Sequence, residues 1–377
     1  KFDEVAEAVR GAAGPLRIRG GGTRGVTGAG VVLDISGLSG ITLYEPGALT
    51  LVVRAGTPLA EVEAVLAAEG QRLAFEPGNW RGLIGTAGVP TVGGVAAANV
   101  AGPRRVQAGA ARDALLGLRF VDGTGMVVKS GGRVMKNVTG YDLVKLLAGS
   151  WGTLGVLTEI SLKVLPAAGA IATLIVPVGS VDAAVGAMAA ALTSPFDVTG
   201  AAMLPGTGVM IRIEGFEGSV AYRAAALAQR LQAHGPVTVE RDPQAAAVLW
   251  QQARDVAPFH GVPGDVWRFS VKPGDAPAIC ARLGGPVMLD WGGGLIWALL
   301  PEGTDARAVA MPYAGHATLI RASAATRARV ARFEPEGQEV AALTAGLRAK
   351  FDPKGILNPG LMEGASGAAR AAQAVGV

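Results

Sequence analysis

The sequence has very few of the side chains that bind metals. It contains one cysteine and three histidines in 377 residues. A single cysteine, Cys280, cannot form an internal disulfide, a four-thiolate zinc site or an iron–sulfur cluster. His234, His260 and His316 stand far apart, and none has the spacing of a metal-ligand pair. We therefore expect no metal site, and any redox chemistry in this chain must use a bound organic cofactor.

Charged and aromatic side chains are also scarce. Charged residues make up 17% of the chain and aromatic residues 5%, against 50% hydrophobic residues. This composition is typical of a globular chain, and the length allows two or three domains. The net charge of +4 comes from scattered arginines. One short basic spot, Arg104 and Arg105, does not make a nucleic-acid groove, so we expect no nucleic-acid partner.

Long apolar runs are missing as well. A long uncharged run lies between Lys163 and Asp182, and Pro166 and Pro177 interrupt it. A membrane-spanning helix needs about 20 mainly apolar residues. The opening letters, KFDEVAEAVR, have the pattern of an amphipathic helix and not of a secretory signal. We expect no transmembrane segment and a cytoplasmic protein, with any contact to the inner membrane made through a complex.

The first 166 residues alternate short strands with helices and glycine-rich turns. Strands are predicted at 16–19 and 31–36, in hairpins within 41–56 and 115–131, and at 155–166. The hairpins turn at Pro46 and at Asp122-Gly123. A helix opens at Thr57-Pro58, with threonine as a suitable N-cap.

The composition shifts after Pro166. Strands are predicted near 171–178, 198–205, 209–216, 266–273 and 287–300, with alanine-rich helices at 181–193, 219–234, 243–256 and 275–283. This alternation predicts one sheet with helices on one face. A last helix at 337–350 leads to FDPKGILNPG, and the final small-residue segment is predicted to be disordered.

Three consecutive glycines follow the first strand. The segment from Gly20 to Gly25 contains G-x-G-x-x-G, but the next element is a strand and not the helix that a Rossmann site requires. Backbone N–H groups of such a loop can instead converge on an anion, with Arg19 and Arg24 on either side. An ordinary tight turn explains the same letters.

Two further segments consist mainly of small residues. GTAGVPTVGGVAAANVAG (85–102) has no charged side chain, and GYDLVKLLAGSWGTLGV (140–156) repeats the glycines. Such stretches fit a backbone pressed against a flat, partly apolar ligand, and they fit close packing between elements equally well. Ser150 stands one glycine short of a nucleophile elbow, and no histidine is placed to serve a hydrolase.

In order along the chain, these segments resemble the FAD-binding domain of the vanillyl-alcohol oxidase/PCMH flavoprotein family. The letters that carry the resemblance are RGGGT, EPG, TVGG…AAN, ARD, DG, GYDL and GSWGTLGV followed by a strand. It covers about residues 1–166, and FDPKGILNPG resembles the family's C-terminal signature. Within the family, KNVTGYDLVKLLAGSWGTLGVLTEISLKVLP and VWRFSVKP are most similar to the FAD-binding (E) subunits of glycolate oxidases.

The resemblance implies an α+β fold in four parts. Residues 1–166 would form a PCMH-type FAD-binding domain of two α/β subdomains. Residues 167–335 would form a smaller α+β cap domain with a mostly antiparallel sheet. Residues 336–362 would return to the FAD domain, and 363–377 would be a disordered tail.

The resemblance also implies which residues hold FAD. They are Arg19, Gly20, Gly21, Gly22, Thr23, Arg24, Pro77, Gly78, Thr91, Gly93, Gly94, Arg112, Asp113, Gly152, Thr153, Leu154, Gly155 and Val156. The first six would surround the pyrophosphate, and Gly21→Val should abolish binding by crowding it. Some relatives tether FAD to a histidine in this loop, and Thr23 stands there instead, so we expect non-covalent FAD.

The second domain departs from relatives that oxidise 2-hydroxy acids. Those relatives carry a metal motif of the form GHxGDGN, and the corresponding segment, LDWGGGLIWALL, has no histidine. Removing a hydride from an alcohol carbon needs a base or metal to take the hydroxyl proton. Arg268 and Lys272 are candidates for a substrate carboxylate and His260 is a candidate base. A purely structural role explains each of the three as well.

The resemblance therefore predicts a FAD-binding subunit of a complex that oxidises glycolate, or a similar small 2-hydroxy acid, to glyoxylate. The expected partners are a D-type flavin subunit, which carries the catalytic metal site, and an F-type iron–sulfur subunit. Two alternatives stay open. One is a self-sufficient FAD-dependent 2-hydroxy acid dehydrogenase, and the other is a non-catalytic scaffold with a vestigial flavin fold.

Overall fold

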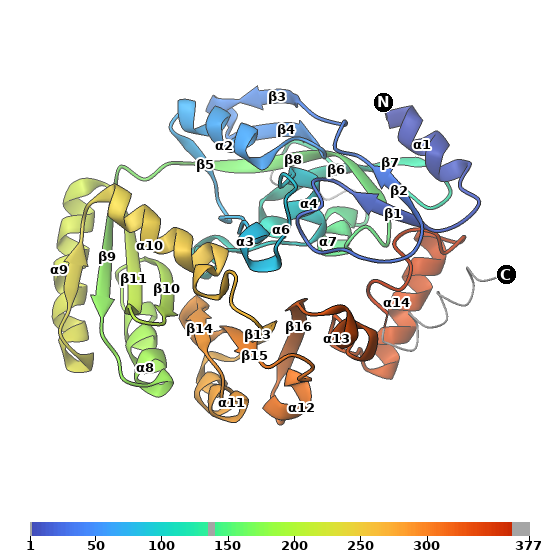
Figure 1. The fold of residues 1–377 in the computed structure, drawn as a ribbon. Helices are drawn as coiled ribbons and strands as arrows, with labels where there is room; N and C mark the ends of the chain where they lie inside the picture. Colours follow the sequence, from blue (N-terminus) through green and yellow to red (C-terminus); the bar gives the residue numbers. More distant parts are fainter. Residues whose placement is uncertain (1, 135–139, 364–377) are drawn as a thin grey trace.

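The computed structural model describes residues 2–134 and 140–363. Most of the predicted tail, and the KNVT letters of the quoted motif, lie outside these residues. Two sheets organise the described chain (Figure 1). One is antiparallel, has six strands and belongs to the N-terminal part, and the other has eight antiparallel strands. The antiparallel α+β architecture expected from the sequence is confirmed.

The N-terminal part begins with a small parallel pair of strands. After α1 (Phe2–Arg10), β1 (Leu16–Arg19) pairs with β2 (Val31–Asp34). The six-stranded sheet contains β3 (Ile41–Glu45), β4 (Thr50–Arg54), β5 (Gln71–Leu73), β6 (Leu115–Val121), β7 (Val127–Gly131) and β8 (Val156–Pro166). Its connections hold α2 (Leu59–Ala68), α3 (Arg81–Ile84), α4 (Val92–Ala97), α5 (Arg105–Ala108), α6 (Ala111–Ala114) and α7 (Leu143–Leu147). Both predicted hairpins are therefore confirmed.

The helix α2 begins differently from the prediction. Its N-cap is Pro58, and the structure gives no side-chain cap. The Thr57 hydroxyl donates instead to the carbonyl of Arg54, at 2.7 Å, and accepts from the N–H of Gly40, at 2.9 Å. Thr57 is thus used to join two turns and not to start the helix.

The eight-stranded sheet has the order β12-β9-β11-β10-β14-β15-β13-β16. Its strands are β9 (Ala170–Val176), β10 (Val198–Leu204), β11 (Gly208–Gly215), β12 (Thr238–Glu240), β13 (Asp265–Val271), β14 (Val287–Asp290), β15 (Leu295–Leu300) and β16 (Gly315–Arg321). The helices of this part are α8 (Val181–Leu192), α9 (Glu217–Leu231), α10 (Pro243–Asp255), α11 (Ala276–Leu283), α12 (Ala306–Ala310) and α13 (Ala324–Arg329). The chain ends in α14 (Gln338–Phe351) and the segment behind it.

Helices cover both faces of the eight-stranded sheet. Alternate residues of β10 and β11 pack on α8 and α9 on one side. Their neighbours pack on the other side, against Trp250 of α10 and against Trp80 and Leu83 from the N-terminal part. The prediction of helices on one face only is therefore wrong. The strands are buried on both faces, which explains why they are apolar at nearly every position and not only at every second one.

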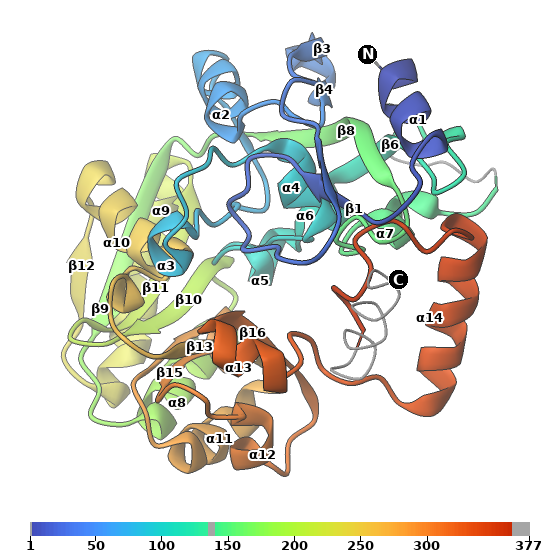
Figure 2. The same ribbon diagram turned by 45° about the vertical axis from the view of Figure 1, so that its right-hand side comes forward.

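The C-terminal segment lies beside β1. The N–H of Leu16 donates to the carbonyl of Ile356 at 2.7 Å, and the N–H of Asn358 donates to the carbonyl of Leu16 at 2.9 Å. Figure 2 shows α14 at the edge of the molecule, leading back toward β1. The last described residues thus join the strand on which the glycine loop begins.

Candidate cofactor site

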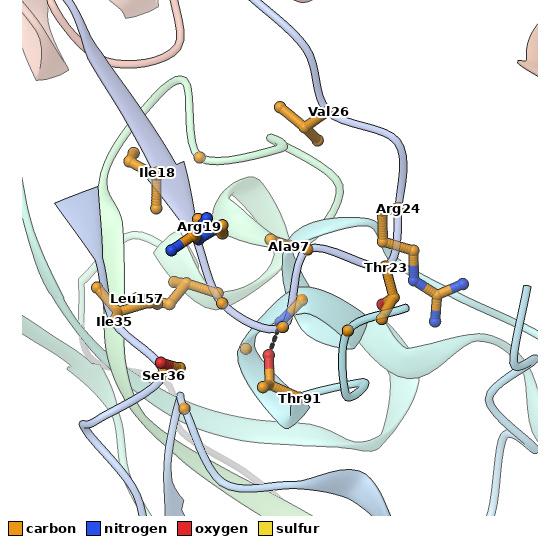
Figure 3. A pocket seen from close by; sticks show the side chains of 18 of the residues that line it. Ile18, Arg19, Thr23, Arg24, Val26, Ile35, Ser36, Thr91, Ala97 and Leu157 are labelled. Carbon is orange, nitrogen blue, oxygen red and sulfur yellow. Dashed lines mark hydrogen bonds between the residues drawn. The ribbon is translucent and has the colours of Figure 1, made fainter. Parts of the chain in front are cut away.

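A cavity of about 740 Å³ opens at the end of β1. Its walls come from the glycine loop, the end of β2, the segment before α4, α4 itself, the turn after α7, β8 and the C-terminal segment (Figure 3). Cavities that hold small molecules and cofactors have volumes of about 300–1,000 Å³. Segments that are far apart in the sequence therefore meet around one ligand-sized space.

The glycine loop packs against the backbone before α4. A Cβ atom on Gly21 would lie 1.5 Å from the carbonyl oxygen of Val89, and one on Gly88 would lie 1.6 Å from the carbonyl oxygen of Gly21. Gly22 also has a φ of +68°, which side chains rarely adopt. Only glycine fits these positions. Gly21→Val would therefore force two cavity walls apart, which differs from the direct crowding expected from the sequence.

Thr91 and two glycines form the part of the wall next to the loop. Thr91 is the N-cap of α4, and its hydroxyl accepts from the N–H of Gly94 at 3.3 Å (Figure 3). A Cβ on Gly93 would meet the carbonyl oxygen of Ala55 at 2.7 Å. The cap and this close approach explain why a helix forms in a glycine-rich stretch, which helix propensity disfavours.

Asn358 joins the turn after α7 to β1. Its Nδ2 donates to the carbonyl of Trp151 at 2.8 Å, and its Oδ1 accepts from the N–H of Ile18 at 2.8 Å. Trp151 has a φ of +54°, and Gly152 and Gly155 follow it along the cavity. The sequence contains Asn358 within FDPKGILNPG, but only the fold shows that this side chain helps to build the site.

The two arginines at the ends of the glycine loop have different surroundings. Arg19 is exposed and forms an ion pair with Asp34 at 2.6 Å. Arg24 is buried, and its Nη2 donates to the carbonyl of Gly78 at 3.0 Å while its guanidinium lies 4.7 Å from the centre of the Trp80 ring. Its Nη1 is buried without a hydrogen-bond partner among the described residues. Burial lowers the pKa of Arg24 to about 10.

Arg332 holds the C-terminal end of the glycine loop. Arg332 donates to the carbonyls of Arg24 and Gly25, at 2.8 and 3.0 Å, and lies over the ring of Trp151 at 4.5 Å. Burial lowers its pKa to about 10 as well. Nothing in the local sequence marks Arg332, because its partners are more than 300 positions away.

The cavity contains many of the expected cofactor residues. Those that line it are Arg19, Gly20, Gly21, Gly22, Thr23, Arg24, Thr91, Gly93, Gly94, Gly152 and Gly155. Those that do not line it are Pro77, Gly78, Arg112, Asp113, Thr153, Leu154 and Val156. Arg112 is exposed, and Asp113 accepts from the N–H of Ala110 at 2.8 Å. The Thr153 hydroxyl donates to the carbonyl of Ser150 at 2.7 Å.

The three candidates for substrate chemistry lie outside this cavity. Arg268, in the middle of β13, stacks on Trp291 at 5.1 Å, and burial lowers its pKa to about 10. Lys272 is exposed just beyond β13. His260 has its Nε2 2.8 Å from the carbonyl oxygen of Asp255. Their proposed roles in catalysis stay predictions.

A buried charge cluster joins the two sheets. We call it the Glu76 cluster, and its members are Arg72, Glu76, Arg104, Arg212 and Glu214. Arg212 donates to both oxygens of Glu76 at 2.8 Å. Burial alone would raise the pKa of Glu214, but Arg212 and Arg104 lower it to about 2. The same two arginines hold the pKa of Glu76 below its usual value.

FAD fits the residues that surround the cavity. The glycine loop, Thr91 and Gly94 line a space of ligand size, and a loop of consecutive glycines can turn backbone N–H groups toward an anion such as a pyrophosphate. Among the described residues, no group of three or more His, Cys, Asp or Glu side chains is placed to hold a metal ion. No helix within the described ranges is long and apolar enough to cross a membrane.

Comparisons with known proteins give a consistent picture. A model of the FAD binding domain family matches residues 1–131. The chain is 36% identical over 353 residues to the glycolate oxidase subunit GlcE of Escherichia coli (strain K12), covering 92% of each chain. It is 30% identical over 175 residues to the glycolate oxidase subunit GlcD of Bacillus subtilis (strain 168), covering 45% of this chain and 36% of that one.

A solved structure supports the same fold. Alkyldihydroxyacetonephosphate synthase aligns with a TM-score of 0.69 at 16% identity, over 95% of this chain and 74% of that chain. At this level of identity the likeness concerns the fold alone.

Proposed function

This chain belongs to the PCMH-type FAD-binding flavoproteins, within the group of glycolate oxidase FAD-binding subunits, and we propose that it carries FAD in a complex that oxidises glycolate to glyoxylate. It is a FAD-linked oxidoreductase, and the cofactor and family expected from the sequence are confirmed. The single observation that carries the proposal is the 36% identity to GlcE along 92% of both chains. The similarity to GlcD supports a 2-hydroxy acid as the substrate class.

The cavity residues would bind and orient the cofactor. The backbone from Gly20 to Gly22, closed by Val89, would hold the pyrophosphate, and Arg24 would fix the end of the loop through Gly78 and Trp80. Trp151 and Asn358 would close the cavity where the C-terminal segment meets the turn after α7. When bound, FAD supplies a two-electron acceptor for hydride transfer. These residues would exclude water from the space and fix the cofactor without a covalent bond.

The positions of the other candidates support a partner-dependent reaction. His260, the candidate base, already contacts the carbonyl of Asp255, and Lys272 is exposed outside the cavity. We propose that proton removal from the substrate takes place on a D-type flavin subunit. An F-type iron–sulfur subunit would then accept the electrons, as the resemblance implies. An association with the inner membrane would come through that complex.

The isolated chain tests this proposal directly. We expect the purified protein to bind added FAD and to show a flavin absorption spectrum. Under anaerobic conditions, glycolate should leave this flavin oxidised, whereas dithionite should bleach it. Addition of the D-type and F-type subunits should restore reduction by glycolate.

Each other outcome favours a different function. Prompt bleaching of the isolated chain by glycolate would favour a self-sufficient dehydrogenase. A chain that cannot take up FAD at all would favour a vestigial scaffold. Retained FAD binding with no co-purifying subunits would remove the support for the complex.

A further inference from the structure

A second, smaller cavity lies on the outer face of the six-stranded sheet. Its volume is about 200 Å³, and residues of β3, β4, β6, β7 and β8 line it together with the loop after β7. The strand positions that point to the opposite face, such as Val53 and Ile160, belong to the core. We call this cavity the sheet hollow. Among the described residues, none lines both the sheet hollow and the cofactor cavity.

The backbone of two paired glycines forms the floor of the sheet hollow. Gly117 of β6 pairs with Gly131 of β7 on one side and with Ser161 of β8 on the other. A Cβ on Gly117 would lie 2.6 Å from the carbonyl oxygen of Gly132, and one on Gly131 would lie 2.3 Å from the carbonyl oxygen of Leu116. A side chain at either position would displace the backbone, so the sheet face is hollowed here.

Charged side chains stand along one border of the sheet hollow. Arg119 follows Gly117 by two positions on β6, and it pairs with Glu159 of β8 and with Lys129 of β7. Directly paired residues of antiparallel strands lie on the same face, so these three side chains stand side by side. Arg119 and Lys129 are like charges in direct opposition, and such a pair destabilises a sheet. An anion beside them would offset this repulsion.

The carboxylate of the sheet hollow is already occupied by other groups. Glu159 is the only acid among the described residues that line it. Its Oε1 lies 3.7 Å from Nη2 of Arg119, and its Oε2 accepts from the Thr42 hydroxyl at 3.5 Å. Lys129 and Arg133 are exposed, and neither forms an ion pair with a described residue. The sheet hollow therefore has two positive charges more than its own carboxylate can balance.

We propose that the sheet hollow binds a small phosphate group, as free phosphate or as a phosphate monoester. Near pH 7 such a group carries a charge of about −1.5 to −2, which matches the two unbalanced cations. The volume of about 200 Å³ lies below the roughly 300–1,000 Å³ of cofactor cavities and suits a small anion. Lys129 and Arg133 would donate charge-assisted hydrogen bonds to its oxygens. This site lies outside the proposed function, because its lining residues are separate from those of the cofactor cavity.

Titration of inorganic phosphate into the chain tests the proposal. Calorimetry at constant ionic strength would be done on the FAD-loaded chain, so that the cofactor cavity is filled. Lys129→Met and Arg133→Met each remove one charge, and Lys129→Arg keeps it. Lys163→Met is the matched control, because Lys163 lies two positions beyond Ser161 on β8, and so on the same sheet face, but does not line the sheet hollow.

We expect saturable binding of one phosphate to the wild-type chain. Lys129→Met and Arg133→Met should each weaken this binding about tenfold, which corresponds to the loss of one charge-assisted hydrogen bond. Lys129→Arg and Lys163→Met should bind phosphate almost as the wild type does. Glycolate carries a single negative charge, and it should bind to the sheet hollow more weakly than phosphate.

Four results would overturn the inference. They are no saturable binding of phosphate, wild-type affinity in both Lys129→Met and Arg133→Met, an equal loss of affinity in Lys163→Met, and tighter binding of glycolate than of phosphate. A chain that takes up no FAD would instead contradict the proposed function. The same titrations on the FAD-free chain would still decide the sheet hollow, so the two failures are distinguishable.

Discussion

The Glu76 cluster and the glycine-loop arginines place buried guanidinium groups in two different electrostatic settings. In the cluster, two carboxylates share three arginines, with the bidentate Arg212–Glu76 contact at 2.8 Å at its centre. At the loop, Arg24 is buried and Arg332 is partly buried, and their partners among the described residues are carbonyl oxygens and aromatic rings. The first setting neutralises its guanidinium groups with carboxylates, and the second binds them through neutral groups.

Similar side chains are therefore buried with different kinds of partner. Both settings include an arginine stacked on a tryptophan, at 4.5 Å for Arg212 and 4.7 Å for Arg24. Stacking is therefore no guide to function. The presence of a carboxylate partner distinguishes the two arginines, because an ion pair offsets part of the cost of burying a guanidinium group.

Removing the charge of Glu76 from its cluster should have the largest effect on stability. Glu76→Gln leaves Arg104 and Arg212 buried without one of their two carboxylates, and loss of one member of a buried ion pair typically costs about 3–5 kcal/mol. Urea unfolding should show a loss of this size. The control is Glu159→Gln, whose contact with Arg119 at 3.7 Å is partly exposed and should cost less than about 1 kcal/mol. Equal losses of stability in the two variants would mean that the Glu76 cluster contributes no more than a partly exposed ion pair.

The pH dependence of stability should test a buried carboxyl group beside the Glu76 cluster, that of Asp290. Burial raises the pKa of Asp290 to about 8, although its Oδ1 accepts from the N–H of Trp291 at 2.7 Å. The folded protein then holds a proton that the unfolded chain releases near pH 4. Wild-type stability should therefore fall as pH rises from about 4 to 8, at up to about 1.4 kcal/mol per pH unit.

Asp290→Asn isolates this contribution. The amide can still accept from Trp291, and it does not titrate, so the difference in stability between variant and wild type should grow from pH 4 to pH 8. Denaturant unfolding at both pH values measures it. A constant difference across this range would show that Asp290 is ionised in the folded protein, paired with Arg212 or Arg268.

The smallest effect should come from the arginine that already has a partner. Arg19→Met removes an exposed ion pair with Asp34, and such pairs contribute about 0.2–1 kcal/mol. FAD affinity, measured by fluorescence titration, should stay close to the wild-type value, because Asp34 already compensates this charge. A large loss of FAD affinity in Arg19→Met would show that Arg19 acts on the cofactor in spite of its ion pair.

The sequence predicted the elements that depend on local patterns. The hairpins at Pro46 and at Asp122 follow from turn residues between apolar runs, and the rejected Rossmann helix follows from a strand directly after the glycine loop. These features need only neighbouring residues. Most strands of the second sheet were predictable for the same reason.

The features that were missed depend on distant contacts. The helix α4 forms across glycines because Thr91 caps it and Ala55 accepts from Gly93. Arg332 reaches the glycine loop from more than 300 positions away, and α10 covers the second sheet face because the N-terminal part supplies Trp80 and Leu83 to the same core. Periodicity and turn chemistry carry no information about such pairings.

Asn358 gives the site an order of assembly in time. It completes the wall between Ile18 and Trp151, yet it follows Ile18 by 340 residues. At about 5–20 residues per second, a ribosome needs roughly 20 to 70 s to make the chain between them. For that interval the glycine loop exists without its last neighbour. The cofactor pocket is therefore a late product of synthesis, even though its signature letters are among the first to emerge.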